Sequence, residues 1–239
     1  MTPSHRRALW CGCLASAPFV IVVVPFAMLF GVVATEAGLN LFEVLLFSIS
    51  VFAGASQFAA LQMMQDQAPV LIILTTSLAI NLRMVMYSVA LAPHLGGAPL
   101  GTRAVMAYFL VDQSFAASQV EFERNPDQSI GDKTAFFFGT VLPIAPLWFA
   151  STLVGAMLGD AIPESYALDF AVPITFLAIT GPMLRSLPHV LAALVSIAAA
   201  LGFAWLPYGS GLLIAAVLAM AVGATAEVML EQRRQAHGG

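Results

Sequence analysis

The feature that most constrains how this chain can fold is a series of apolar runs, each about as long as a membrane-crossing helix. A helix needs about 20 apolar residues to span a hydrocarbon core of about 30 Å. The runs that approach or exceed this length are residues 8–31, 41–64, 70–91, 104–120, 134–158, 167–184, 189–206 and 209–230. They are continuously apolar, whereas strands of membrane barrels alternate between apolar and polar residues. The sequence therefore predicts an all-α, polytopic membrane protein with about eight transmembrane helices.

The composition agrees with this fold class and excludes several others. Of the 239 residues, 60% are hydrophobic and 9% are charged, against about 25% charged in an ordinary globular chain. The net charge of −4 offers no basic surface for a nucleic acid. The 4 histidines stand at the ends of the runs, so we expect no metal site and no cofactor. Because no Walker A, G-x-S-x-G or H-E-x-x-H motif occurs, we expect no enzymatic activity.

Lysine and arginine residues predict the orientation, since short cytoplasmic loops carry an excess of both. With eight crossings, the basic residues on the cytoplasmic side are Arg6, Arg7, Arg124, Lys133, Arg185, Arg233 and Arg234. Arg103 alone falls in an external loop. We therefore expect a multi-pass protein of the cell (inner) membrane with both termini in the cytoplasm. The first run is expected to remain as a helix, because the apolar stretch before the candidate cleavage site, 8–14, is too short for a leader peptide and the apolar sequence continues to Gly31.

The chain is expected to form a single transmembrane transporter domain, residues 1–239, built from two halves. A polar stretch, 121–133, separates the first half, 8–120, from the second, 134–230. Small and polar residues interrupt one run in each half, at 53–57 and near Thr175 and Thr180. Interrupted helices expose backbone groups that bind solutes, and they recur at matching positions of internal repeats. The alternative is a small-residue patch for close helix packing. Gln57 favours the interruption, because an amide in lipid needs a partner.

Two ionisable residues, Arg83 and Asp112, lie deep within apolar runs. A charge near the bilayer centre costs roughly 2.5–3.5 kcal/mol, so each marks a candidate site. Each lies eight residues from the outer end of its run, which is about 12 Å of helix. We expect the two helices, sequential and antiparallel, to bring the charges together as an ion pair or into one wet cavity. Asp112 is the candidate coupling residue; a pair that only fixes helix register is the alternative.

Other polar residues at similar depth complete a candidate substrate site. Tyr87 follows Arg83 by one helical turn, and Asn81 precedes it. These groups can orient the guanidinium or contact a substrate, whereas their alternative role is hydrogen bonding between helices. The candidate substrate-binding residues are Gly54, Ser56, Gln57, Asn81, Arg83, Tyr87, Thr175 and Thr180.

Several of these motifs are similar, in order, to those of one family. They are FAGASQF at 52–58, INLR at 80–83 with Tyr87, the dipeptide at 112–113, and LDFA at 168–171 with Thr175. Together they resemble the AzlC family of branched-chain amino-acid exporters over about residues 14–230. Where the family pattern is Asp-Glu, this chain has Asp112-Gln113.

The resemblance implies a secondary exporter of valine, leucine, isoleucine and methionine. It also implies a small AzlD-like membrane subunit as partner and dependence on the proton-motive force. The residues alone indicate only a transporter of a small solute. A channel for a small neutral solute and a non-catalytic subunit of a membrane transport complex are the alternatives, and a homo-oligomer is compatible with the sequence.

Overall fold

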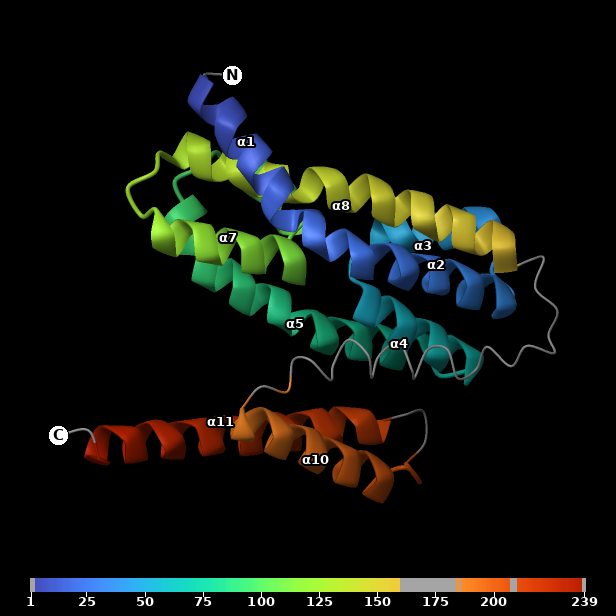
Figure 1. Cartoon of the computed structure of the whole chain (residues 1–239). Coiled ribbons are helices and arrows are strands. Elements are labelled where there is room, and N and C mark those ends of the chain that lie inside the picture. The colour runs from blue at the N-terminus through green and yellow to red at the C-terminus, as the bar shows by residue number, and fades with distance from the viewer. Residues whose placement is uncertain (1–2, 160–183, 185, 207–209, 238–239) are drawn as a thin grey trace. The chain divides into compact units, whose positions relative to one another are not determined.

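The computed structural model describes residues 3–159, 184, 186–206 and 210–237, and every element in that part of the chain is a helix (Figure 1). The all-α class is therefore confirmed for these residues. The chain divides into two compact units. The first comprises Met1–Phe58 and Ile80–Tyr166, and the second comprises Ala59–Ala79 and Ala167–Gly239. Two helices, α4 (Gly54–Gln65) and α5 (Val70–Leu95), contribute to both units.

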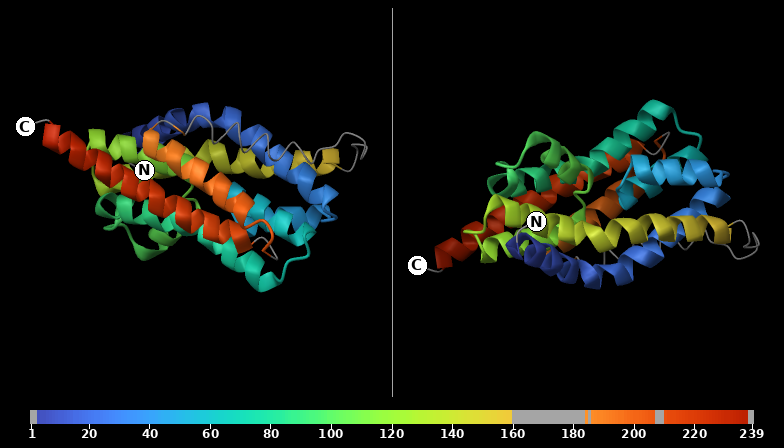
Figure 2. Two further views of the ribbon diagram at one scale, coloured as in Figure 1. Left: turned by 90° about the horizontal axis from the view of Figure 1, so that it is seen from below. Right: turned by 90° about the horizontal axis from the view of Figure 1, so that it is seen from above.

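Two long helical stretches form the frame of the first unit. One consists of α1 (Pro3–Ser16), the short 3-10 helix η1 (Ala17–Phe19) and α2 (Val20–Glu36), in that order, and the other is α8 (Ile130–Gly159). Pro18 stands in η1, where it interrupts the ladder between α1 and α2. Helix α8 packs along both α1 and α2 (Figures 1 and 2).

Glycines allow α8 to approach its neighbours closely. A Cβ atom at Gly139 would collide with the backbone of α1, and one at Gly155 would collide with the backbone of α2 at Met28. Small residues at such positions let membrane helices pack backbone against backbone. The frame therefore depends on the lack of a side chain at these positions.

The run at 41–64 is two helices joined at a break. Helix α3 (Leu41–Ser50) begins with a capping box between Asn40 and Glu43, and residues 51–53 separate it from α4. Phe47 of α3 and Phe58 of α4 both lie 5.6 Å from the ring of Phe30 in α2. The chain therefore turns at the break, since residues on both sides of it contact the same ring. We call this turn the first hairpin; its α3 arm of 10 residues is about 15 Å long, half the hydrocarbon thickness.

The run at 104–120 is broken as well. Helix α6 (Leu100–Tyr108) and helix α7 (Asp112–Arg124) are separated by residues 109–111. Tyr87 of α5 stacks on Phe115 of α7 with the ring centroids 4.2 Å apart. Further along, His94 of α5 lies 5.4 Å from Phe122 of α7. Helix α7 therefore runs parallel to α5 and returns to the end where α5 finishes. We call α6 and α7 the second hairpin.

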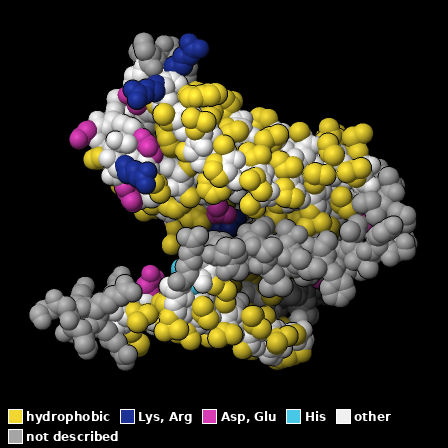
Figure 3. Space-filling model, in the orientation of Figure 1, with side chains coloured by type: hydrophobic (Ala, Val, Ile, Leu, Met, Phe, Trp, Pro, Cys, Tyr) yellow, Lys and Arg dark blue, Asp and Glu magenta, His cyan; other side chains and the backbone are white. Residues whose placement is uncertain are grey.

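Side-chain contacts place one set of helix ends together. His5 Nδ1 lies 2.7 Å from Asp132 Oδ1, and Lys133 Nζ lies 3.5 Å from His94 Nδ1. The start of α1, the turn after α5 and the start of α8 thus share one end of the first unit. We name it the basic end, after Arg6, Arg7, Arg103, Arg124 and Lys133. Figure 3 shows charged side chains gathered there and apolar side chains over α2 and α8.

At the opposite end of the first unit, α8 finishes beside the last turn of α2. A Cβ atom at Gly159 would meet Thr35 and Val32, and Glu36 is the last residue of α2. The first hairpin follows directly and therefore enters from this opposite end, whereas the second hairpin enters from the basic end.

Three expectations from the sequence need correction. The run at 104–120 is not a single crossing helix, because it breaks at 109–111. Arg103 therefore lies at the same end as the N-terminus and not across the membrane from it. The helices that carry Arg83 and Asp112 are parallel rather than antiparallel. In the described residues, 4 helices are long and apolar enough to cross a membrane, and Leu41–Ser50 and Leu187–Gly202 are shorter apolar helices. The count of eight is thus not confirmed.

The second unit contains a pair of packed helices, α10 (Leu187–Gly202) and α11 (Ser210–His237). Gly223 of α11 faces Ala192 of α10, where a Cβ atom would lie 3.2 Å from the alanine methyl. Thr175 and Thr180, the candidate residues of the second half, lie outside the described residues.

Candidate functional site

The two hairpins enter the first unit from opposite ends and meet at their breaks. The Tyr108 hydroxyl donates a hydrogen bond to the carbonyl oxygen of Ile49 at 2.5 Å. The rings of Phe52 and Phe109, one from each break, pack edge to face at 5.7 Å. Polar backbone groups released by two interrupted helices therefore come together inside the first unit. Interrupted helices of this kind form the solute sites of many membrane transporters.

A serine supports each break. Ser56 Oγ donates to the carbonyl oxygen of Ala53 at 3.0 Å. Ser114 Oγ accepts from the backbone N–H of Val111 at 2.9 Å and lies 3.0 Å from the carbonyl oxygens of Phe109 and Val111. In both hairpins the serine stands three residues after the last residue of the break. Its hydroxyl satisfies backbone groups that an uninterrupted helix would have paired.

Aromatic rings close the first break from the side of α2 and α8. A Cβ atom at Gly54 would collide with the rings of Phe26 and Trp148. Trp148 also donates its indole N–H to Ser48 Oγ at 3.0 Å and lies 5.7 Å from the ring of Phe52. Gly54 is therefore required because two rings rest against the backbone where α4 begins.

The expected ion pair is present. Arg83 Nη1 lies 3.1 Å from Asp112 Oδ2, with side chains 32% and 41% exposed. Tyr87 donates its hydroxyl hydrogen to Asp112 Oδ1 at 2.8 Å. Asp112 is also the first residue of α7, where the helix dipole favours a negative charge. The carboxylate is thus stabilised by a cation, a phenol and a helix N-terminus together.

Helix α5 joins the two hairpins through three side chains. Asn81 Nδ2 donates to Ser56 Oγ of the first hairpin at 3.1 Å, whereas Arg83 and Tyr87 hold Asp112 of the second. Helix α5 therefore connects Ser56 of the first hairpin with Asp112 of the second.

Several buried polar atoms beside this junction have no protein partner among the described residues. They are Nε2 and Oε1 of Gln57, Oδ1 of Asn81 and Nε of Arg83. The Gln57 side chain is fully buried, at 0% exposure. An unpaired buried polar atom costs about 1–3 kcal/mol. Both hydrogen-bond donors and acceptors occur among these atoms.

Most of the residues proposed from the sequence are brought together. They lie at the hairpin junction or on the adjoining part of α5: Gly54, Ser56, Gln57, Asn81, Arg83, Tyr87 and Asp112. Sequence reasoning missed Tyr108 and Ser114. For Ser114, the spacing Val111-x-x-Ser114 repeats Ala53-x-x-Ser56 and is a usable signal; Tyr108 has no comparable signal, because its partner is a backbone carbonyl 59 residues away.

Comparison with known proteins identifies the family. The model of the family described as AzlC protein matches residues 18–162. The inner membrane protein YgaZ of Escherichia coli (strain K12) is 30% identical over 173 residues, which cover 70% of this chain and 69% of the relative. An uncharacterized membrane protein of Archaeoglobus fulgidus is 33% identical over 214 residues, 87% of this chain and 90% of the relative. No solved structure matches significantly. The chain is a membrane protein and belongs to the AzlC family.

Proposed function

We propose that this chain is a secondary transporter that exports branched-chain amino acids, namely valine, leucine and isoleucine, and also methionine, across the cytoplasmic membrane. Membership of the AzlC family is consistent with membrane transport. The hairpin junction supports a solute site, and the resemblance of the motifs to branched-chain amino-acid exporters supplies the substrate.

One observation carries the proposal: the unpaired buried polar atoms of Gln57, Asn81 and Arg83 beside the junction. The N–H groups of Gln57 and Arg83 can donate to a carboxylate, and the oxygens of Gln57 and Asn81 can accept from an ammonium group. Helices α4 and α7 both begin at the junction, and their N-termini are positive dipole ends that favour the carboxylate. The aliphatic side chain of the substrate would lie against the neighbouring rings.

Asp112 is the proposed coupling residue. The charged carboxylate would hold the ammonium group of the substrate, and a proton that enters from the outside would neutralise the carboxylate and release the substrate there. The proton would leave on the cytoplasmic side when the next substrate binds. This exchange would link proton movement to substrate movement without an enzymatic step.

The transporter is proposed to work with a small AzlD-like membrane subunit, with the basic end in the cytoplasm according to the positive-inside rule. Neither the orientation nor the partner is needed for the chemistry at the junction. The partner would therefore affect assembly or rate rather than the identity of the substrate.

The test is leucine counterflow in liposomes that contain the purified protein, with and without the small subunit, under an imposed pH gradient. The expected result is saturable uptake of [14C]leucine that rises with the gradient. Rapid flux that neither saturates nor accumulates leucine would indicate a channel instead. No flux for the chain alone, with restored flux on adding the subunit, would assign substrate binding or assembly to the complex.

A further inference from the structure

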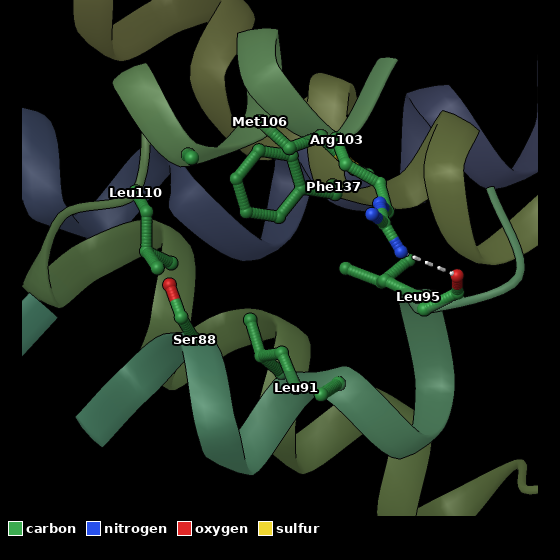
Figure 4. A pocket seen from close by; sticks show the side chains of 10 residues that line it. Ser88, Leu91, Leu95, Arg103, Met106, Leu110 and Phe137 are labelled. Atoms are coloured by element: carbon green, nitrogen blue, oxygen red, sulfur yellow. Dashed lines mark hydrogen bonds between the residues drawn. The ribbon is translucent and has the colours of Figure 1, made fainter. Parts of the chain in front are cut away.

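A separate pocket lies between the last turns of α5 and helix α6, with Phe137 of α8 as a wall (Figure 4). Its volume is about 250 Å³. Its lining runs from Ser88 to Gly96 along α5 and from Arg103 to Leu110 along α6 and the break that follows. The pocket therefore connects the basic end with the second hairpin, entirely within the first unit.

The lining combines an apolar wall with one cation. Leu91, Leu95, Met106 and Phe137 supply the wall. Arg103 stands at one end, where its Nη1 donates to the carbonyl oxygen of Gly96 at 3.0 Å (Figure 4). That bond orients the guanidinium and uses one of its five N–H donors. In the part of the chain that the structure describes, no carboxylate lies within ion-pair distance of Arg103. A ligand with a carboxylate and an apolar body fits this lining.

The size of the pocket fits an occupant of that chemistry. Its volume of about 250 Å³ is about eight times the share of one molecule in liquid water, about 30 Å³. An amino acid with a branched aliphatic side chain can therefore enter it whole.

The inner end of the pocket adjoins the candidate site. Ser88 follows Tyr87 in the sequence, and Leu110 belongs to the break two residues before Asp112. In Figure 4, Ser88 and Leu110 lie together at the end away from Arg103. The inner end of the pocket is therefore next in the chain to residues that hold the ion pair.

We propose that this pocket is a loading site, which takes one branched-chain amino acid by its carboxylate on Arg103 before the molecule reaches the hairpin junction. The inference rests on the proposed function and deepens it, because it assigns the chain two substrate sites in series. Arg103 lies at the basic end, which the positive-inside rule places in the cytoplasm. An exporter takes its substrate from that side.

The test measures how many [14C]leucine molecules bind to each purified full-length chain at saturation. Two leucines per chain are expected for the wild type and one for Ala107→Trp, whose indole would fill the pocket. Ala104→Trp is the matched control, because Ala104 is also an exposed alanine of α6 but does not line the pocket; it should bind two. Arg103→Gln should raise the leucine concentration for half-maximal counterflow about tenfold, and Arg103→Lys should raise it less.

Each of the other outcomes contradicts the loading site, and one of them also contradicts the proposed function. One leucine per wild-type chain, with counterflow intact and unchanged in Ala107→Trp, removes the loading site and leaves the proposed function in place. Slower counterflow in Ala107→Trp with two leucines still bound assigns the pocket to a lipid or a partner segment and also removes the loading site. No leucine binding and no counterflow by the wild type, alone or with the small subunit, would overturn both proposals.

Discussion

Asp112 has three stabilising partners in the structure, and two of them act through its charge. Replacing it with asparagine keeps the size and removes the charge that faces Arg83. We expect Asp112→Asn to insert into the membrane normally and to lose leucine transport driven by a pH gradient. Asp127→Asn, in the exposed connection after α7, is the control and should transport normally. Counterflow measured across a range of pH decides the point, and a wild-type rate for Asp112→Asn at every pH would exclude the coupling role.

Gln57 offers a test in which stability and activity move in opposite directions. Its buried amide has no protein partner among the described residues, so an apolar side chain of similar shape should pack at lower cost. We expect Gln57→Met to raise the melting temperature by about 2–4 °C for each 1 kcal/mol gained and to lower leucine transport. The measurements are thermal unfolding in detergent and counterflow in liposomes.

Gln65→Met is the control for this test, because Gln65 is exposed at the end of the same helix. It should change neither quantity. If Gln57→Met lowers stability and leaves transport unchanged, the amide has a packing role, and the substrate contact assigned to it is wrong.

At the scale of the elements, the close contact between α8 and α2 predicts that a side chain at Gly155 lowers stability. Alanine at Gly155 would press its methyl group into the backbone at Met28. We expect Gly155→Ala to lower the free energy of unfolding by about 1–3 kcal/mol, the usual cost of overpacking. Gly101→Ala is the matched control, since Gly101 is also helical and a Cβ atom there meets nothing within 4 Å. It should be neutral or stabilising by up to about 1 kcal/mol. Thermal unfolding of both variants gives the comparison, and equal stabilities would contradict the close packing.

The two breaks show what the sequence can and cannot predict about the elements. An interruption of the first run was predicted at 53–57, because of its small residues and Gln57; the structure places the break at 51–53, and residues 54–57 form the first turn of α4. The second break was not predicted, because Phe109, Leu110 and Val111 are as apolar as any membrane helix. The chain breaks there through tertiary contacts, chiefly the Tyr108 bond to Ile49 and the capping by Ser114.

The pairing of Arg83 with Asp112 was predicted even though the directions of their helices were not. A lone charge in lipid is so costly that two opposite charges at similar depth in neighbouring runs have few other partners. That argument holds for parallel and antiparallel helices alike. Depth and charge could therefore be read from the sequence, whereas the return of α7 toward the basic end could not.

At the scale of the whole molecule, the second hairpin predicts that both of its ends face the same side of the membrane. The turn before α6 and the connection after α7 lie at the same end of the first unit. In a background without Cys11 and Cys13, we expect Gly101→Cys and Asp127→Cys to react with a membrane-impermeant maleimide only after the cells are permeabilised. Ala37→Cys, in the turn after α2 at the opposite end, should react in intact cells. Labelling of Gly101→Cys in intact cells, with Asp127→Cys protected, would mean that α6 and α7 cross the membrane.

The hydrogen bond from Trp148 to Ser48 has a consequence for how the protein is made. The two residues are 100 positions apart, so the ribosome adds the tryptophan roughly 5–20 s after the serine at 5–20 residues per second. Until then, the first hairpin is synthesised but lacks the ring that closes its break. Unpaired backbone groups are not tolerated against lipid. Insertion of the first hairpin into its final place must therefore follow the synthesis of α8, although the hairpin precedes α8 in the chain.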